Sequence, residues 1–362
     1  MRRILFASTL IGLMLLFSVS ALWAQDAQTS VTTIPVESKA SMVKLSPDDH
    51  TLAVYNNYVI YDEAPTADLT RITLIDLESG DPIDTLSGYS DWVTDVAFNA
   101  DGSRLVSFHR NGDLLVWDMN SKTLIKTIPT YTIGGSWVQF LNDDKTVLFR
   151  AGELVIGMLD TESGAITHLF GQHIDTYAEY SETYTQFPAR GDITFVAAAV
   201  SPDGQWLVFS TANDEVILWN IATGNQRTLR EKSEKFGLFS IRSFVFSQDG
   251  SQLAYFDQVD KKTHLWDVAK RGEIGAYDVG GLSFALAPDG KTIAWADRES
   301  NTVYLADTTS SDAPTTLVEL PERMKVSPLT SLAFTSDGKQ VVVGGLFAED
   351  GDNQITVVNL AS

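Results

Sequence analysis

The five histidines are the side chains of this sequence best suited to acid–base or metal chemistry near neutral pH. No two of them have the spacing of metal ligands, and the chain contains no cysteine. It also contains no Gly-x-Ser-x-Gly elbow, no His-Glu-x-x-His motif, no phosphate-binding glycine loop and no dinucleotide fingerprint. We therefore predict a non-enzymatic protein with no catalytic residue, no metal and no cofactor. One alternative stays open, because histidines distant in sequence can still meet in space: His50, His109, His168, His173 and His264.

Aromatic side chains crowd one segment, residues 171–191, which reads GQHIDTYAEYSETYTQFPARG. Rings with a polar tip are favoured in binding surfaces, and long connections are often functional. We predict that this segment binds a partner; the alternative is that its rings pack onto the fold as a lid. The residues we predict to bind are His173, Tyr177, Tyr180, Tyr184 and Phe187.

Two further connections, residues 56–71 and 347–353, are rich in acids. Oxygen-rich clusters suit calcium, but Asp350-Gly351-Asp352-Asn353 lacks the remaining ligands of a calcium loop. The plainer interpretation is a set of solvated turn acids. We add Asp62 and Asp350 to the predicted binding residues.

The charge balance restricts the partners. Asp and Glu number 47 against 26 Lys and Arg, so the formal net charge is −21. Such a surface repels nucleic-acid phosphates and anionic lipid headgroups. We therefore expect no nucleic-acid partner, and no membrane partner unless the leader is retained as an anchor. We also expect a monomer in solution.

The first residues are typical of an export signal. Met1-Arg2-Arg3 is a short basic start, and residues 4–23 are almost unbroken apolar sequence. Ala21 and Ala24 are small residues of the kind that precede a cleavage site. We predict a signal peptide over residues 1–24, with cleavage after Ala24 or, as the second choice, after Ala21. Residues 25–362 then form the exported domain, periplasmic or extracellular. The alternative is an uncleaved anchor.

A repeat organises the rest of the chain. Seven times, an apolar run turns near an Asp-Gly-like pair, returns as a second apolar run, and reaches a Trp-Asp-like pair. Successive pairs are 42, 42, 60, 47, 40 and 52 residues apart. A period near 40–45 residues with four short strands per unit indicates a β-propeller blade. The pairs are Ile75-Asp76, Trp117-Asp118, Leu159-Asp160, Trp219-Asn220, Trp266-Asp267, Ala306-Asp307 and Val358-Asn359.

The second unit shows the pattern most clearly. Alternating apolar residues predict strands over 93–98, 104–107, 114–118 and 122–128. Asp101-Gly102 and Asn111-Gly112 are turn sequences, because Asp and Asn bond their own backbone and Gly accepts unusual dihedral angles. We predict an all-β, seven-bladed propeller built of four-stranded antiparallel blades. Its upper face is the end where the second strand turns into the third and the fourth leads to the next blade.

The second unit, from Leu86 to Asp118, resembles a WD repeat, and the resemblance extends over nearly all of the chain after the leader. It implies a propeller that binds proteins, with no common ligand. The family's Gly-His pair is Gly88-Tyr89 here, and only three of the seven pairs keep Trp. We therefore expect the buried Asp-His-Ser-Trp network typical of the family to be absent and the blades to rest on apolar packing.

Closure of the ring can also be predicted. The last unit ends at its third strand, residues 354–359, and Val31 to Pro35 resembles an outer strand. We predict that Val31–Pro35 supplies the fourth strand of the last blade. The function we predict is an exported, non-catalytic scaffold that binds a protein or peptide on its upper face. The alternative is a propeller hydrolase or lactonase with a small-molecule site at the central channel.

Overall fold

The computed structural model describes most of the chain after the first 29 residues. The described residues are 30–36, 41–56, 70–89, 91–130, 135–151, 155–171, 195–232, 240–241, 243–278, 281, 283–297, 300–309, 315–320, 324–325, 330–345, 347–348 and 354–360. They form strands and turns, with no helix among them. In this described part, accordingly, there is no helix that could span a membrane.

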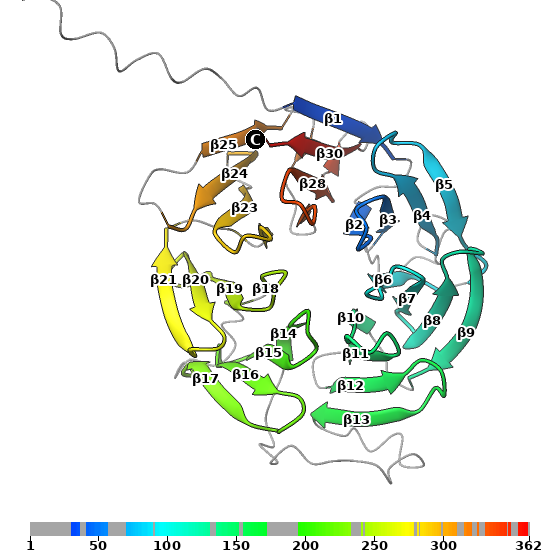
Figure 1. The fold of residues 1–362 in the computed structure, drawn as a ribbon, viewed down its shortest axis with the longest axis horizontal. Helices are drawn as coiled ribbons and strands as arrows, with labels where there is room; N and C mark the ends of the chain where they lie inside the picture. The colour runs from blue at the N-terminus through cyan, green and yellow to red at the C-terminus, as the bar shows by residue number, and fades with distance from the viewer. Residues whose placement is uncertain are drawn as a thin grey trace, which may run out of the picture.

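Seven four-stranded antiparallel sheets surround a common centre, as Figure 1 shows, and confirm the predicted propeller. The first three blades are β2 (Ser41–Leu45), β3 (Thr51–Asn56), β4 (Ile72–Asp76) and β5 (Pro82–Leu86); β6 (Val93–Phe98), β7 (Arg104–His109), β8 (Asp113–Asp118) and β9 (Thr123–Pro129); β10 (Gly135–Phe140), β11 (Thr146–Ala151), β12 (Val155–Asp160) and β13 (Ile166–Gly171).

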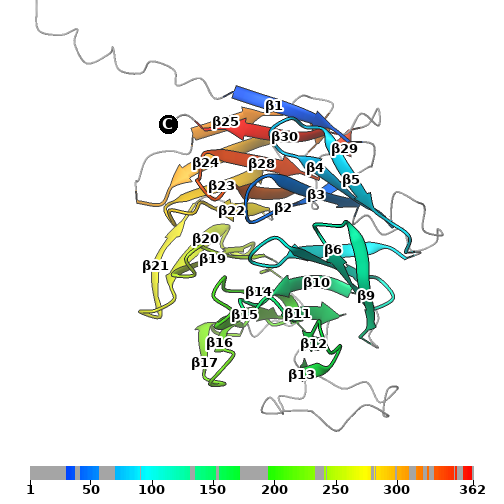
Figure 2. The ribbon, with the colours of Figure 1, turned by 45° about the vertical axis from the view of Figure 1, so that its right-hand side comes forward.

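The next three blades follow the same order from the centre outward. They are β14 (Phe195–Val200), β15 (Trp206–Thr211), β16 (Val216–Asn220) and β17 (Gln226–Arg230); β18 (Phe244–Phe246), β19 (Gln252–Asp257), β20 (Lys262–Asp267) and β21 (Gly272–Tyr277); β22 (Phe284–Leu286), β23 (Thr292–Asp297), β24 (Thr302–Asp307) and β25 (Thr315–Glu319). Figure 2 shows the ring obliquely, turned by 45° from the view of Figure 1.

The seventh blade joins the first described strand to the last and confirms the predicted closure. Its strands are β27 (Ser331–Phe334), β28 (Gln340–Gly344), β30 (Gln354–Asn359) and β1 (Ser30–Pro35). Strand β1 pairs antiparallel with β30, with Val31 opposite Val358. A small additional sheet, which the sequence does not predict, pairs β26 (Met324–Lys325) with β29 (Phe347–Ala348).

Burial along the strands explains why these residues form blades. Strand β6 is buried at five of its six positions, as an inner strand should be, whereas five of the seven residues of outer strand β9 are exposed. Seven apolar clusters form the core, and each joins two neighbouring blades. Phe108 and Phe149, for example, meet edge to face between blades 2 and 3, with ring centroids 5.6 Å apart. Packing between blades therefore holds the ring together.

The Asp-Gly turns shape the lower face. In blade 2, Gly102 has a φ of 71°, and the Asp101 carboxylate accepts a hydrogen bond from the Ser103 backbone at 2.8 Å. Hydrogen bonds from Ser103, from its side chain and then its backbone, lower the pKa of Asp101. The turns also join blades: Asp144 of blade 3 accepts from Ala100 N of blade 2 at 2.8 Å, and Asp49 of blade 1 accepts from Ser336 N of blade 7 at 2.7 Å.

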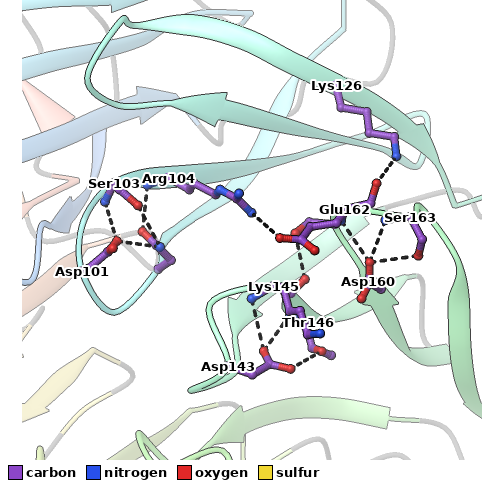
Figure 3. Close-up of polar contacts among 12 residues, drawn as sticks. Asp101, Ser103, Arg104, Lys126, Asp143, Lys145, Thr146, Asp160, Glu162 and Ser163 are labelled. Atoms are coloured by element: carbon purple, nitrogen blue, oxygen red, sulfur yellow. Dashed lines mark hydrogen bonds and ion pairs between the residues drawn. The ribbon is translucent and has the colours of Figure 1, made fainter.

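An ion pair adds to the seam between blades 2 and 3 on the lower face. Figure 3 shows Arg104 of β7 pointing toward Glu162, in the turn after β12, with Nη1 and Oε1 3.7 Å apart. Lys126 Nζ of β9 donates to the Glu162 carbonyl oxygen at 2.7 Å. Because Glu162 is largely exposed, this ion pair contributes little to stability. Glu162 is therefore an exposed residue of the lower face whose substitution should not unfold the protein.

Candidate functional site

The predicted binding residues lie outside the part of the chain that the structure describes. They are His173, Tyr177, Tyr180, Tyr184, Phe187, Asp62 and Asp350. Their connections can nevertheless be located by the described strands on either side. The first joins β13 to β14, the second joins β3 to β4, and the third, in blade 7, leads to β30. Since blade strands alternate in direction, all of these flanking strand ends lie at the upper face.

A polar group is fully described at the upper edge of blade 2, where the β7–β8 turn meets the segment before β6. Arg110 N donates to the Trp92 carbonyl oxygen at 3.0 Å, and this hydrogen bond connects the turn to the segment before β6. We call this group the blade-2 rim and define it by five residues that are half-buried or exposed: Tyr89, Asp91, Arg110, Asn111 and Asp113. It contains acids, a cation and an aromatic ring, which is a composition suited to contact with another protein.

Hydrogen bonds fix the geometry of the blade-2 rim. Tyr89 donates its hydroxyl to Asp113, and Asn111 Nδ2 donates to Asp113 Oδ2 at 2.8 Å. Asn111 N donates to Asp91 Oδ2 at 2.7 Å. Desolvation by burial raises the pKa of Tyr89 to about 12, so its hydroxyl stays a donor at neutral pH. The Arg110 guanidinium lies 4.6 Å from the centre of the Trp92 ring, in the arrangement of a cation–π contact.

Behind the rim, a serine and a histidine lie in the arrangement of a nucleophile and its base. Ser107 Oγ and His109 Nε2 are 3.0 Å apart. However, Ser107 is 0 % and His109 1 % exposed, so no substrate reaches them. His109 Nδ1 faces the Asp91 carbonyl oxygen at 3.0 Å, and Trp117 Nε1 donates to Ser107 Oγ at 2.9 Å.

These contacts define one consistent set of protons. A carbonyl only accepts, so His109 Nδ1 carries the proton and Nε2 accepts from Ser107. Desolvation lowers the pKa of His109 to about 4, which keeps the ring neutral. The expectation that such a network is absent is wrong in part for blade 2: a buried His-Ser-Trp chain is present, with the backbone carbonyl of Asp91 in place of an Asp side chain. It forms because the histidine comes from the second strand, two residues after the serine, while Tyr89 stands in the Gly-His position.

A buried carboxylate joins three blades near the start of the ring. Asp95, on inner strand β6, is 6 % exposed. Its Oδ1 accepts from the Tyr55 hydroxyl of blade 1 at 2.8 Å, and its Oδ2 accepts from Val138 N of blade 3 at 3.0 Å. Lys44 Nζ lies 3.7 Å from Oδ1. With these partners, Asp95 has a structural role.

A second charged group spans blades 4 and 5 at the upper face. Arg230 ends β17, and its Nη2 lies 2.9 Å from Asp257 Oδ2, while Nη1 donates to the Asp214 carbonyl oxygen at 2.7 Å. Asp214 is fully buried, with Ser240 N donating to its Oδ1 at 2.7 Å. Among the described residues, one set brings three potential metal-ligand atoms within 4.8 Å of one another: Asp257, Asp260 and His264.

Comparison with known proteins finds similarity to WD-repeat proteins. Residues 80–118, which include all of the blade-2 rim, match the model of the WD domain, G-beta repeat. An uncharacterized WD repeat-containing protein of Synechocystis sp. is 28% identical over 160 residues, which are 43% of this chain and 42% of that protein. The Periodic tryptophan protein 2 homolog of Schizosaccharomyces pombe is 24% identical over 298 residues, which are 77% of this chain and 34% of that protein. The chain thus spans less than half the length of both relatives.

Among solved structures, the chain is similar to the β-propeller domain of Myceliophteria thermophila Cps50 (Swd1). The TM-score is 0.68 at 12% sequence identity, and the likeness covers 92% of this chain and 100% of that one. At that identity the likeness concerns the fold alone. The repeat match and the WD-repeat relative show that the chain is similar to WD-repeat proteins, and the solved structure shares its propeller fold.

Proposed function

We propose that the chain is an exported, non-catalytic scaffold that binds a protein or peptide partner on its upper face. WD-repeat propellers typically act as scaffolds for protein interaction. The observation that carries the proposal is the location of the long connections, because the described strands on either side of each of them end at the upper face. The blade-2 rim lies at the same face.

The chemistry of the described polar groups also favours binding over catalysis. The Ser107–His109 pair is buried and fully used by hydrogen bonds to Trp117 and Asp91. Asp95 is held by neighbours from both adjacent blades. We therefore expect no turnover in a panel of esters, lactones, phosphates and peptides. Turnover that disappears on substitution of residues at the channel mouth would favour the hydrolase alternative.

The proposed partner has a complementary charge. The chain carries a formal charge of −21, and acidic surfaces steer basic partners toward them. We propose a partner with a basic contact surface, which the aromatic residues Tyr177, Tyr180, Tyr184 and Phe187 anchor together with His173. Asp62 and Asp350 add acidic contacts from the neighbouring connections. Export to the periplasm or the exterior is part of the same proposal and rests on the apolar leader.

The test is affinity capture from the host cell envelope with matched variants. Arg110→Ala and Asn111→Ala change the upper face, whereas Glu162→Ala changes the exposed lower face. We expect one protein to be captured by the native chain and by Glu162→Ala but much less by the upper-face variants. Equal capture by all three variants would place the binding surface elsewhere.

A further inference from the structure

Three side chains of blade 5 bring oxygen and nitrogen ligands together where β19 turns into β20. Asp257 ends β19, Asp260 lies in the turn, and His264 is the third residue of β20. One ligand atom from each lies within 4.8 Å of the other two. We propose that a divalent transition-metal ion of the zinc class binds between Asp257, Asp260 and His264. This site does not depend on the proposed scaffold function.

The orientation of His264 is the strongest argument for a metal. Its Nδ1 faces Glu273 Oε1 of β21 at 2.7 Å, and its ring stacks on Tyr255 with centroids 4.9 Å apart and 15° between the planes. A carboxylate on the far ring nitrogen is the arrangement that orients metal-binding histidines in proteins. With Nδ1 facing Glu273, Nε2 is the ring nitrogen that is turned toward the other two ligand residues.

The second ligand atom lies beside Nε2. His264 Nε2 is 2.9 Å from Asp260 Oδ2. A cation placed between these two atoms is bound by both of them. Ligand atoms of a tetrahedral zinc site, with bonds of about 2.0–2.1 Å, lie about 3.3 Å apart. The distance between His264 Nε2 and Asp260 Oδ2 therefore needs to grow only slightly to admit the ion. The Asp257 carboxylate, whose ligand atom lies within 4.8 Å of both, needs to move closer.

The Arg230 guanidinium pairs with Asp257, and an incoming ion must displace it. A second carboxylate, that of Asp214 in blade 4, lies near the same guanidinium. Arg230 Nη2 lies 2.9 Å from Asp257 Oδ2. Its Nη1 lies 3.9 Å from Asp214 Oδ2, an atom that is fully buried and makes no hydrogen bond. A buried carboxylate oxygen without a donor is unfavourable. A movement of Arg230 toward Asp214 satisfies that oxygen and releases Asp257 for the metal.

The donor set selects the kind of ion. One imidazole nitrogen with two carboxylates suits zinc and its neighbours, whereas Mg²⁺ prefers six oxygen ligands in an octahedron. Three protein ligands leave at least one coordination position for water. Asp257, Asp260 and Glu273 together provide three negative charges against the single charge of Arg230, which favours a dication. The sequence predicts no metal site, because this part of the chain has only one histidine. The carboxylates near it come from the end of β19, the following turn and β21, and only the fold brings them together.

The experiment is isothermal titration calorimetry of the full chain with ZnCl₂, repeated with MgCl₂. We expect one zinc ion per chain and no comparable binding of Mg²⁺. Glu273→Gln, which removes only the orienting carboxylate, should weaken zinc binding by about 10–100-fold. His264→Ala should weaken it by at least as much. His50→Ala is the matched control, because His50 lies in an exposed turn of blade 1 and should leave binding unchanged.

Zinc that does not bind, or that binds His264→Ala as tightly as the native chain, would overturn the proposal. Circular dichroism accompanies each variant. If His264→Ala fails to fold, Asp260→Asn takes its place, because the Asp260 side chain is 41% exposed and its loss leaves the core intact. Unchanged zinc binding by folded Asp260→Asn would overturn the proposal in the same way.

Discussion

The hydroxyl of Tyr55 and the carboxylate of Asp95 lie 2.8 Å apart, although one belongs to blade 1 and the other to blade 2. Both side chains are buried, with Tyr55 2% exposed. Desolvation by burial, with the Asp95 charge beside it, raises the pKa of the Tyr55 hydroxyl well above its usual value. Because Asp95 also accepts from Val138 N of blade 3, one carboxylate fixes the relative positions of three blades.

This relationship predicts coupled losses of stability. Tyr55→Phe should lower the free energy of unfolding by about 1–3 kcal/mol, because it leaves a buried carboxylate oxygen with one donor fewer. Asp95→Asn should cost a similar amount, and the double variant less than the sum of the two. Chemical denaturation of the three variants measures these losses of free energy.

The control is Tyr304→Phe, which removes an exposed hydroxyl contact to Ser300 and should change stability by less than about 0.5 kcal/mol. Strict additivity would contradict a direct interaction.

The buried His109 predicts a pH dependence of stability. Burial lowers its pKa from 6.5 to about 4, so below pH 6.5 the unfolded chain binds a proton that the folded chain does not. Stability is therefore fully present above pH 6.5 and falls as the pH drops toward 4. We expect a loss of about 2 kcal/mol between pH 6.5 and pH 5 from this residue. Denaturation curves of His109→Gln should lose this component, and those of the exposed-turn variant His50→Ala should keep it.

Ring closure gives a matched pair of substitutions within one strand. Ile34 of β1 is 2% exposed and packs in the cluster between blades 7 and 1, whereas Val31 is 45% exposed. Ile34→Ala should cost about 2–4 kcal/mol through lost burial and the cavity left behind, and Val31→Ala less than about 0.5 kcal/mol. Deletion of residues 31–35 should cost more than either, because the hydrogen bonds to β30 are lost as well. Equal melting temperatures for the native and deleted chains would contradict closure by β1.

The leader predicts a defined new N-terminus. Protein recovered from the host envelope or medium should begin at Gln25, or at Leu22 if cleavage follows Ala21. N-terminal sequencing or intact-mass measurement decides this. An intact Met1 on a membrane-bound form would instead support the uncleaved anchor.

Much of the fold could be predicted from alternation and turn chemistry. The predicted first strand of unit 2, residues 93–98, coincides with β6, and the strand predicted over 104–107 extends to His109 in β7. The turns at Gly102 and Gly112 were marked by Asp-Gly and Asn-Gly, whose glycines have positive φ angles of 71° and 87°. Local sequence suffices here because a blade is built from strands that are neighbours in the chain.

The polar sites were harder to predict because they depend on side chains from different strands. Ser107 and His109 are two residues apart on one strand and so point to the same face, which is a signal in the sequence. Their third partner, Trp117, becomes visible only with the pairing of β7 and β8. The cluster around His264 needs the turn after β19 and the pairing of β20 with β21. The aromatic residues of the 171–191 segment lie outside the described residues and stay predictions.

Partner binding by a chain without the aromatic segment tests the proposed function most directly. Residues 173–189 are replaced by a short Gly-Ser linker between β13 and β14, a change that costs little in loop-closure entropy. We expect an unchanged melting temperature and a loss of about 2 kcal/mol or more in binding free energy to the captured partner, because aromatic anchors dominate such interfaces. Glu162→Ala on the lower face should bind as the native chain does. A folded replacement that binds the partner with unchanged affinity would contradict partner binding by the aromatic segment.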